Sequence, residues 1–408
     1  MNIAFVSQPF DRLNPGLQNS IGMWTYEVGR RLAGKSKVTV YVGGIPGHEQ
    51  LRGGKGMEYR SMSLEPDQRL VRLLERKGWT LGKNRPAFSS PFYYLFYALR
   101  VAADIAIHDF DIIHVYNFTQ FISIIRSINP RPNVVLNMRC GWLSQLDRQI
   151  VEPRLSGVDM IMGVSEHVTR GISDRFPGLA PICHTVNNGA HAVQTSRREV
   201  GQDVLFVGRV SPEKGVHVLL EAFAYLADRF PGTKLKVVGR KRQLPMGMLV
   251  GISDEPGVSG LSRFYTGGSL DEYQKYLEGR TTELGLEDRV TFTGFLPHSD
   301  VLDLYTRSYL LVNPSLSESF GRSLIEAMMA GIPVVASDAG GMGEIVRDGE
   351  SGFLVEAGDS KGLASAMALL LGDRELGKRM GEAGRRVAKE SYGWDLIAAK
   401  VYELYRNL

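Results

Sequence analysis

Short apolar runs alternate with amphipathic, helical segments along almost the whole chain. Runs rich in Val, Ile and Leu are typical of strands buried on both faces of a parallel sheet, and helices between them favour right-handed βαβ units. The first series predicts strands at residues 2–7, 38–42, 112–115, 134–137 and 160–164, with a helix at 23–32. The second predicts strands at 204–208, 234–239, 290–293, 310–313 and 333–337, with helices at 217–229, 300–308 and 321–330.

Because the series starts twice, we predict two α/β domains, each with a doubly wound, Rossmann-like parallel sheet. A chain of 408 residues is also too long for one ordinary core. The break falls at residues 190–202. The tail is helical, and residues 394–404 carry Trp394, Ile397, Val401 and Leu404 on one face.

Composition indicates a globular protein, with 43% hydrophobic and 23% charged residues. The net charge of +4 is uneven: residues 1–190 hold 22 Lys and Arg against 15 Asp and Glu, so the rest is net negative. An anionic partner would suit the basic half, as would an ordinary solvated surface. Cys140 and Cys183 predict neither a disulfide framework nor a metal site, which suits the cytoplasm. We expect neither a signal peptide nor a membrane-spanning helix.

Residues 313–337 have the richest chemistry, because a strand, a Gly-containing loop and a helix follow one another there. A loop that leads into a helix presents free N–H groups and a positive dipole end, which favour a diphosphate. Glu318 lies in the loop, where it can accept hydrogen bonds from ligand hydroxyls, and Glu326 lies on a helix face that can reach a ribose. The alternatives are a dipole-stabilised carboxylate at Glu318 and an ordinary exposed helix residue at Glu326.

A second candidate loop, residues 207–215, follows the first strand of the second series. Arg209 and Lys214 could both reach a phosphate, the guanidinium as a planar fork and the ammonium as a point charge. A surface turn with solvated charges is the alternative. The strand-to-helix position favours the first interpretation, because α/β sheets bind ligands at such loops.

Together these segments resemble the retaining glycosyltransferases of the family often called GT4, which have the GT-B fold. The resemblance covers nearly the whole chain and depends on several motifs in a fixed order. The strongest is the pair Glu318 and Glu326, separated by seven residues. The others are Val164-Ser165-Glu166, Asn188-Gly189 and the segments 207–215, 331–337, 340–346 and 349–355.

The resemblance implies two Rossmann-like domains facing each other across a cleft, with a C-terminal helix that crosses back to the N-terminal domain. Residues 1–190, joined by 386–408, would bind the acceptor, and residues 191–385 would bind the nucleotide-sugar donor. The implied enzyme transfers a sugar, with retention, from a UDP- or GDP-sugar to a hydroxyl of a glycan, a lipid-linked molecule or a small molecule. It implies no metal and no cofactor.

The resemblance also assigns roles to residues. Arg209 and Lys214 would bind the donor diphosphate and stabilise the leaving group. Glu318 would hold donor-sugar hydroxyls, and Glu326 would bind the ribose. The backbone of the remaining donor-binding residues would contact sugar and phosphate: Gly208, Ser319, Phe320 and Gly321.

The N-terminal half departs from the family pattern at two places. Asn19 and Ser20 stand where the family usually has a Gly-Gly pair, and Arg139 stands where a His is common. Arg139 could bind a phosphate or an acidic acceptor but cannot act as a general base. His114 is either part of the same site or a structural histidine. We take these residues and Gly16 as possible phosphate or acceptor contacts.

Residues 68–99 combine basic and aromatic side chains. The basic stretch holds Arg69, Arg72, Arg76, Lys77, Lys83 and Arg85 with Trp79, and the aromatic run holds Phe88, Phe92, Tyr93, Tyr94, Phe96 and Tyr97. A solvated helix followed by an aromatic core helix explains this pattern. The alternative is an acceptor-binding or peripheral membrane patch, at the inner face of a membrane. Nucleic acid is not an expected partner, because the basic stretch is short and carries no known binding motif.

Two other functions stay open at this point. The departures at Asn19, Ser20 and Arg139 permit a sugar-nucleotide-binding partner protein without transferase activity, although the intact donor motifs argue against it. The second open function is that of a nucleotide-sugar epimerase or a phosphorylase on the same fold. The sequence does not predict the oligomeric state.

Overall fold

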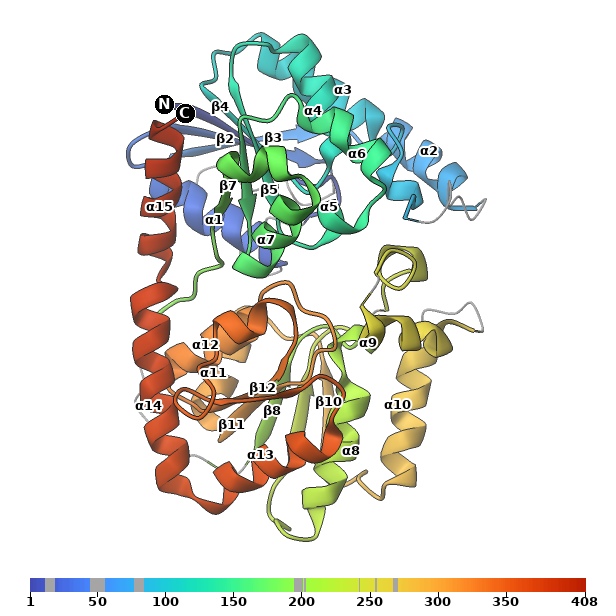
Figure 1. The fold of residues 1–408 in the computed structure, drawn as a ribbon, viewed down its shortest axis with the longest axis vertical. Coiled ribbons are helices and arrows are strands. Elements are labelled where there is room, and N and C mark those ends of the chain that lie inside the picture. The colour runs from blue at the N-terminus through green and yellow to red at the C-terminus, as the bar shows by residue number, and fades with distance from the viewer. Residues whose placement is uncertain are drawn as a thin grey trace. The chain divides into compact units, whose positions relative to one another are not determined.

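The computed structural model describes residues 1–11, 19–44, 56–76, 84–193, 201, 203–241, 243–253, 255–266 and 271–408. The chain divides into two compact units, Met1–Asn188 with Trp394–Leu408 (unit 1) and Gly189–Gly393 (unit 2) (Figure 1). The division near residue 189 lies at the start of the predicted break. Residues 386–393 differ from the expectation, because helix α14 (Arg374–Ser391) keeps most of them in unit 2 and only α15 (Trp394–Arg406) joins unit 1.

Unit 1 is built, in its described residues, on a seven-stranded parallel sheet of order β3-β2-β1-β4-β5-β6-β7. Its strands are β1 (Asn2–Val6), β2 (Lys37–Gly43), β3 (Met57–Met62), β4 (Ile112–Tyr116), β5 (Asn133–Met138), β6 (Met160–Gly163) and β7 (Cys183–Thr185). Its helices, besides α15, are α1 (Ser20–Leu32), α2 (Glu65–Arg76), α3 (Leu95–Ala106), α4 (Thr119–Ile128), α5 (Trp142–Gln145), α6 (Arg148–Leu155) and α7 (Glu166–Arg175). The strand order reverses between β1 and β4, so the ligand-binding edge of this sheet is expected at their carboxyl ends.

Unit 2 contains, in its described residues, a six-stranded parallel sheet of order β10-β9-β8-β11-β12-β13. Its strands are β8 (Val204–Val207), β9 (Leu235–Val238), β10 (Val290–Gly294), β11 (Leu310–Asn313), β12 (Val334–Asp338) and β13 (Phe353–Glu356). Its helices, besides α14, are α8 (Val216–Ala227), α9 (Pro256–Ser259), α10 (Glu272–Glu283), α11 (His298–Arg307), α12 (Arg322–Ala330) and α13 (Ser360–Gly372). All ten strands predicted from the sequence are present, and the strand order of this sheet reverses between β8 and β11.

The C-terminal helix α15 packs against α1 in unit 1, where Figure 1 shows the red and blue helices side by side. The predicted apolar face is confirmed, because Trp394, Ile397 and Val401 are buried in the core that also contains β1 and β4 residues. An amphipathic helix at the end of the chain therefore completes the core of the first domain.

His114 of β4 lies in this core, which favours the structural histidine over the ligand contact. Its Nδ1 atom is 2.5 Å from the hydroxyl of Tyr405 in α15, and its ring stacks on Trp24 at 5.4 Å. The residue is fully buried, and burial lowers its pKa well below the usual value of 6.5. His114 is therefore a neutral structural histidine that joins β4 to the C-terminal helix.

Replacement of Tyr405 by Phe should lower the free energy of unfolding of unit 1 by about 1–3 kcal/mol, because His114 Nδ1 would be left buried without its partner. Tryptophan fluorescence in a urea titration measures this, since all four tryptophans belong to unit 1. Tyr402→Phe in the same helix is the control and should change stability far less. Equal unfolding midpoints for the two variants would contradict the role given to His114.

Candidate functional site

Two loops meet at the carboxyl edge of the unit 2 sheet. β8 and β11 pair in parallel, so the loops that follow them leave the sheet at the same edge. Lys214 in the first loop places its Nζ 2.7 Å from Oε2 of Glu318 in the second, and the Leu316 N–H donates to the carbonyl of Glu213 at 2.8 Å. The structure therefore brings the two loops predicted from the sequence together, at the point where the strand order reverses.

Glycines permit close approach of backbone to backbone at this junction, Gly215 between the two loops and Gly340 in a third loop that follows β12. Gly215 has φ +66°, and a Cβ there would lie 2.0 Å from the carbonyl oxygen of Pro314. Gly340 has φ +57°, and a Cβ there would lie 1.9 Å from the carbonyl oxygen of Glu318, which accepts a hydrogen bond from Gly341 N at 3.0 Å. A side chain at either position would push the Glu318 loop out of place.

Glu213 holds Arg209 beside the loop junction. Its Oε1 accepts from Arg209 Nη2 at 2.6 Å and from the Ser211 hydroxyl at 2.6 Å, and Ser211 also accepts from Arg209 Nε at 3.1 Å. Glu213 is buried, which by itself raises the pKa of its carboxyl, but the charges of Arg209 and Lys214 bring that pKa below its ordinary value. A buried carboxylate thus fixes a guanidinium that is itself about one third exposed. The sequence motif contained Glu213, but sequence reasoning assigned it no role.

Lys214 and Glu318 form a pair that can exchange partners. Their side chains are 17% and 19% exposed, so solvent and a ligand can reach both. The two cations and two carboxylates at the junction balance in charge. An arriving diphosphate would compete with Glu318 for Lys214 and would leave the Glu318 oxygens to accept hydrogen bonds from hydroxyl groups.

The other residues expected to contact the donor lie in the same two loops. Phe320 turns its side chain into unit 2, where its ring lies 5.7 Å from that of Tyr392. Gly321 has φ +106° and precedes α12, so its backbone conformation suits glycine. Gly208 follows β8 directly and donates from its N–H to Val238 O at 2.9 Å. These residues, with Ser319 between Glu318 and Phe320, follow the ends of β8 and β11.

Glu326 of α12 is buried and already has three donors. Its Oε1 lies 3.0 Å from His298 Nε2 and 3.4 Å from Arg322 Nη1, and its Oε2 accepts from the Tyr305 hydroxyl at 3.1 Å. Burial raises the pKa of this carboxyl, but the charge of Arg322 and the hydrogen bond from His298 outweigh it and set the pKa to about 2. Glu326 is therefore not an exposed helix residue. It joins α12 to α11, and a ribose hydroxyl would have to share or displace one of its donors.

In unit 1, Asn19 begins helix α1 as its N-cap. Its Oδ1 accepts from Gly22 N at 2.7 Å, and its Nδ2 donates to Asp11 Oδ1 at 2.6 Å. Asp11 is fully buried, and burial raises the pKa of its carboxyl to about 6. Ser20 is the exposed first residue of α1. Gly16 lies outside the described residues.

Arg139 follows β5, and the three acceptors of its guanidinium are uncharged, one of them being Asn137 Oδ1 at 3.5 Å from Nη1. Its Nη1 donates to Val186 O at 2.9 Å, its Nη2 donates to Asn188 Oδ1, and its guanidinium lies 5.2 Å from the Trp24 ring centroid. Burial lowers the pKa of this guanidinium to about 9. An anionic ligand group would therefore meet a cation that none of these acceptors neutralises.

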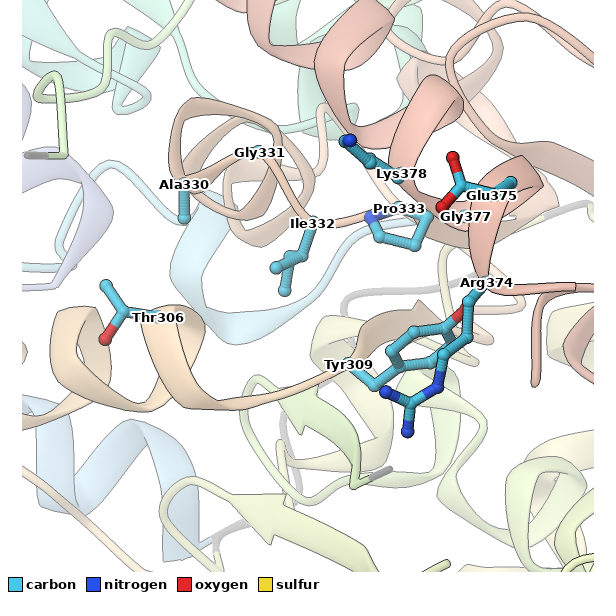
Figure 2. Close-up of a pocket in the computed structure, with 10 residues that line it drawn as sticks. All are labelled: Thr306, Tyr309, Ala330, Gly331, Ile332, Pro333, Arg374, Glu375, Gly377 and Lys378. Carbon is cyan, nitrogen blue, oxygen red and sulfur yellow. The ribbon is translucent and has the colours of Figure 1, made fainter. Parts of the chain in front are cut away.

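A separate cavity of about 200 Å³ lies at the other edge of the unit 2 sheet (Figure 2). Tyr309 and Pro333, which line it, precede β11 and β12, whereas Glu318 follows β11. Arg374 and Lys378 of α14 contribute its cationic side chains. Because it opens at the amino ends of the strands, this cavity is not part of the Glu318 site.

The described ranges lack two kinds of feature. They contain no group of three His, Cys, Asp or Glu side chains arranged to hold a metal ion. Among the helices assigned there, none has both the length and the apolar character that crossing a membrane requires.

Comparison with known proteins matches the C-terminal part of the chain to a family described as "Glycosyl transferases group 1", over residues 190–387. Spore coat protein SA of Bacillus subtilis is 27% identical over 336 residues, which cover 76% of this chain and 82% of that protein. A D-inositol 3-phosphate glycosyltransferase of Corynebacterium glutamicum is 35% identical over 221 residues, 53% of this chain and 47% of that protein.

Solved structures resemble the whole chain. HepE of Anabaena, in complex with UDP and glucose, has a TM-score of 0.73 at 20% identity and covers 100% of this chain and 99% of its own. Sucrose-phosphate synthase of Thermosynechococcus elongatus has a TM-score of 0.74 at 21% identity, with 100% and 98% covered. At this identity the likeness shows the fold, which is the predicted GT-B architecture of two parallel α/β domains.

The Glu326 cluster predicts a specific dependence of stability on pH. Because the folded-state pKa of about 2 lies below the ordinary value of 4.5, the stabilisation is complete above pH 4.5 and is lost as the pH falls toward 2. Glu326→Gln should lower the free energy of unfolding by about 3 kcal/mol at pH 7. Urea titrations followed by circular dichroism should show this difference shrinking below pH 4.5.

The exposed Glu350 supplies the matched control, because Glu350→Gln removes a carboxylate that pairs only at the surface with Arg347. Its effect should be small at every pH. If Glu326→Gln lost no more stability than this control at pH 7, the structural role of Glu326 would be wrong.

Proposed function

We propose that the chain is a glycosyltransferase of the retaining, GT4 type that uses a UDP- or GDP-sugar, and the match of residues 190–387 to the family "Glycosyl transferases group 1" supports this. The observation that carries the proposal is the Lys214–Glu318 pair beside Arg209, where the loops after β8 and β11 meet. The UDP-glucose and UDP complexes of Anabaena HepE, a protein of the same fold, support a nucleotide-sugar donor.

The proposed mechanism depends on where negative charge develops during the transfer. When the bond between the sugar and the diphosphate breaks, its electron pair goes to the phosphate oxygen, and the sugar acquires oxocarbenium-like character. Arg209 and Lys214 are positioned to neutralise the departing diphosphate without a metal ion. Glu318, released from Lys214, accepts hydrogen bonds from the donor sugar. The acceptor oxygen attacks from the same face, and its proton goes to the departing phosphate, which accounts for retention.

Glu213 is a positioning residue in this proposal. Its carboxylate holds Arg209 through a 2.6 Å ion pair and is itself too buried to contact the donor. Glu326 acts on the ribose only through an exchange of its present partners, Tyr305, His298 and Arg322.

We assign the acceptor to the carboxyl edge of the unit 1 sheet, with Arg139 as the group that meets an anionic acceptor. The uncharged partners of Arg139 support this assignment. So does the name of several relatives, D-inositol 3-phosphate glycosyltransferase, although this chain spans only about half of their length. Asn19 and Ser20 would contribute polar contacts at the start of α1. The two free cysteines, Cys140 and Cys183, suit a cytoplasmic enzyme.

A panel of UDP-, GDP- and ADP-sugars tests the activity, with donor hydrolysis and transfer as the readouts. We expect one nucleotide to raise the melting temperature of the protein and its sugar donor to be consumed. Binding without turnover on any acceptor would favour a sugar-nucleotide-binding partner protein. Interconversion of the donor would favour an epimerase.

Lys214→Ala should lower kcat roughly 100- to 1,000-fold, because the leaving diphosphate loses one preorganised cation. The far-UV circular dichroism spectrum should not change. Lys378→Ala is the matched control, since this lysine belongs to unit 2 but lines the cavity at the other sheet edge. Near-normal turnover in Lys214→Ala, or an equal loss in Lys378→Ala, would contradict the assignment of the donor site.

A double-mutant cycle tests the positioning role of Glu213. Glu213→Gln should lower kcat/KM by about tenfold, since one charge-assisted hydrogen bond to Arg209 is lost. If Glu213 acts only through Arg209, the double variant Arg209→Ala/Glu213→Gln should have the kcat/KM of Arg209→Ala alone. Losses that multiply would show that Glu213 acts by another route.

A further inference from the structure

The outward face of helix α3 is apolar along its length. Phe92, just before the helix, and Phe96 and Leu99 within it follow the i, i+4, i+7 spacing of one helix face. They are 53%, 41% and 40% exposed. Ala103 and Ala106 continue the exposed face toward the end of the helix. A surface helix normally presents charged or polar residues to water, and an exposed run of large apolar side chains marks an interaction surface.

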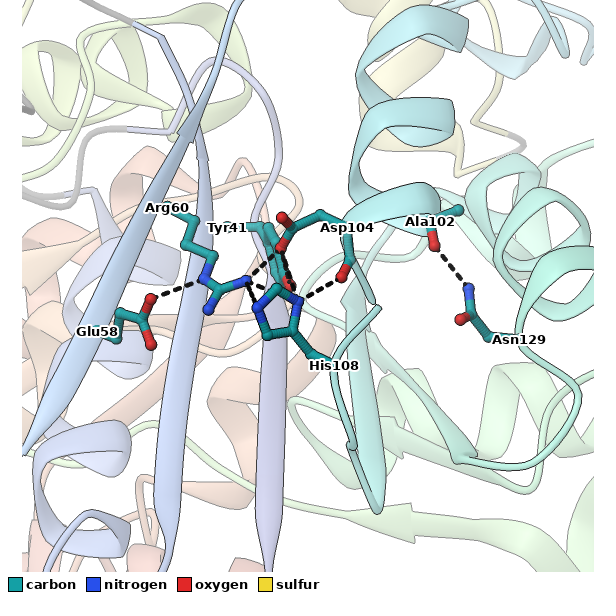
Figure 3. A network of polar contacts seen from close by, with 7 residues as sticks. All are labelled: Tyr41, Glu58, Arg60, Ala102, Asp104, His108 and Asn129. Atoms are coloured by element: carbon teal, nitrogen blue, oxygen red, sulfur yellow. Dashed lines mark hydrogen bonds and ion pairs between the residues drawn. The ribbon is translucent and has the colours of Figure 1, made fainter. Parts of the chain in front are cut away.

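The rotation of α3 is fixed from the opposite side, so the apolar face does not result from a loosely held helix. Figure 3 shows Asp104 of α3 turned toward the sheet, where it accepts from Tyr41 at 2.7 Å and from Arg60 Nη1 at 2.6 Å. The Tyr97 hydroxyl donates to Ser7 O at 3.0 Å. The polar groups of this helix are thus used inside unit 1.

Helix α2 adds basic side chains next to this face. Asp67 of α2 accepts from Phe96 N at 2.9 Å, which joins the two helices at the start of α3. On α2, Arg69 and Arg72 are exposed, and Leu73 is 56% exposed. The α2–α3 surface, defined by Arg69, Arg72, Leu73, Phe92, Phe96 and Leu99, therefore combines arginines with aromatic and aliphatic side chains.

We propose that the α2–α3 surface binds the headgroup region of an anionic lipid bilayer, with Phe92, Phe96 and Leu99 in the interface and Arg69 and Arg72 on anionic headgroups. Charge complementarity selects a lipid surface, because residues 1–190 carry a net positive charge and arginines flank the apolar face. Aromatic and leucine side chains on one helix face, with basic residues beside them, are the pattern of helices that lie in the plane of the interface. The inference does not depend on the donor site, which lies in unit 2.

Vesicle cosedimentation tests the proposal with the full chain. The protein should sediment with vesicles that contain phosphatidylglycerol and remain in solution with pure phosphatidylcholine. Arg69→Gln/Arg72→Gln should weaken binding at least tenfold, since each basic side chain near an anionic surface contributes a factor of about five. Phe96→Gln/Leu99→Gln should weaken it comparably.

The matched control replaces two other exposed apolar residues of unit 1, Ile128 and Leu396, which are 41% and 49% exposed. Ile128→Gln/Leu396→Gln should bind vesicles as the unchanged protein does. Donor hydrolysis in solution should be the same in all variants, so a failure of the lipid proposal is distinguishable from a failure of the proposed activity. Absence of vesicle binding by the unchanged protein would overturn the proposal. So would a dimer in analytical ultracentrifugation that Phe96→Gln/Leu99→Gln dissociates, because a second copy would then cover this face.

Discussion

The ion pair between Lys214 and Glu318 depends on two parallel strands that end side by side. β8 and β11 are neighbours in the unit 2 sheet, and this is where the strand order reverses. Their loops can touch because the position closest to the opposing backbone is a glycine, Gly215, and a second glycine, Gly340 after β12, lets a third loop approach Glu318. The backbone, more than any one side chain, therefore determines where a cation and a carboxylate can both face a ligand.

Most of the fold could be predicted from hydrophobic patterning. The strands that this pattern does not predict share one feature. Central strands such as β4 and β11 are buried on both faces, so their Val, Ile and Leu runs stand out in the sequence. The three strands that were missed, β3, β7 and β13, each form an edge of the described sheets. An edge strand is half exposed, so polar residues interrupt it, as in Met57–Met62. Of the four edge strands of the described sheets, only β10 is predicted by the sequence pattern.

The candidate site could be predicted only where its geometry is local. The two candidate loops follow directly from strand–loop–helix order, so the sequence alone predicts Lys214 and Glu318 as site residues. Burial of Glu326 and His114 depends instead on α11 and α15, which approach from elsewhere in the chain. Glu326 was expected to face a ligand or solvent and is surrounded by donors, and His114 is enclosed in the core. The spacing of residues within one motif gives no information about contacts with elements that are distant in the sequence.

The two carboxylates that pair with Arg209 and Lys214 in the proposed donor site differ in exposure, and this difference suits them to different roles. Glu213 is almost fully buried, so separating it from Arg209 would leave an uncompensated charge in the protein interior. That ion pair is therefore permanent and serves to aim the guanidinium. Glu318 is partly exposed, so solvent or a sugar hydroxyl can reach its carboxylate and replace Lys214. A fixed cation next to an exchangeable one suits a site whose ligand gains negative charge during the reaction, because one partner orients the diphosphate and the other adjusts to it.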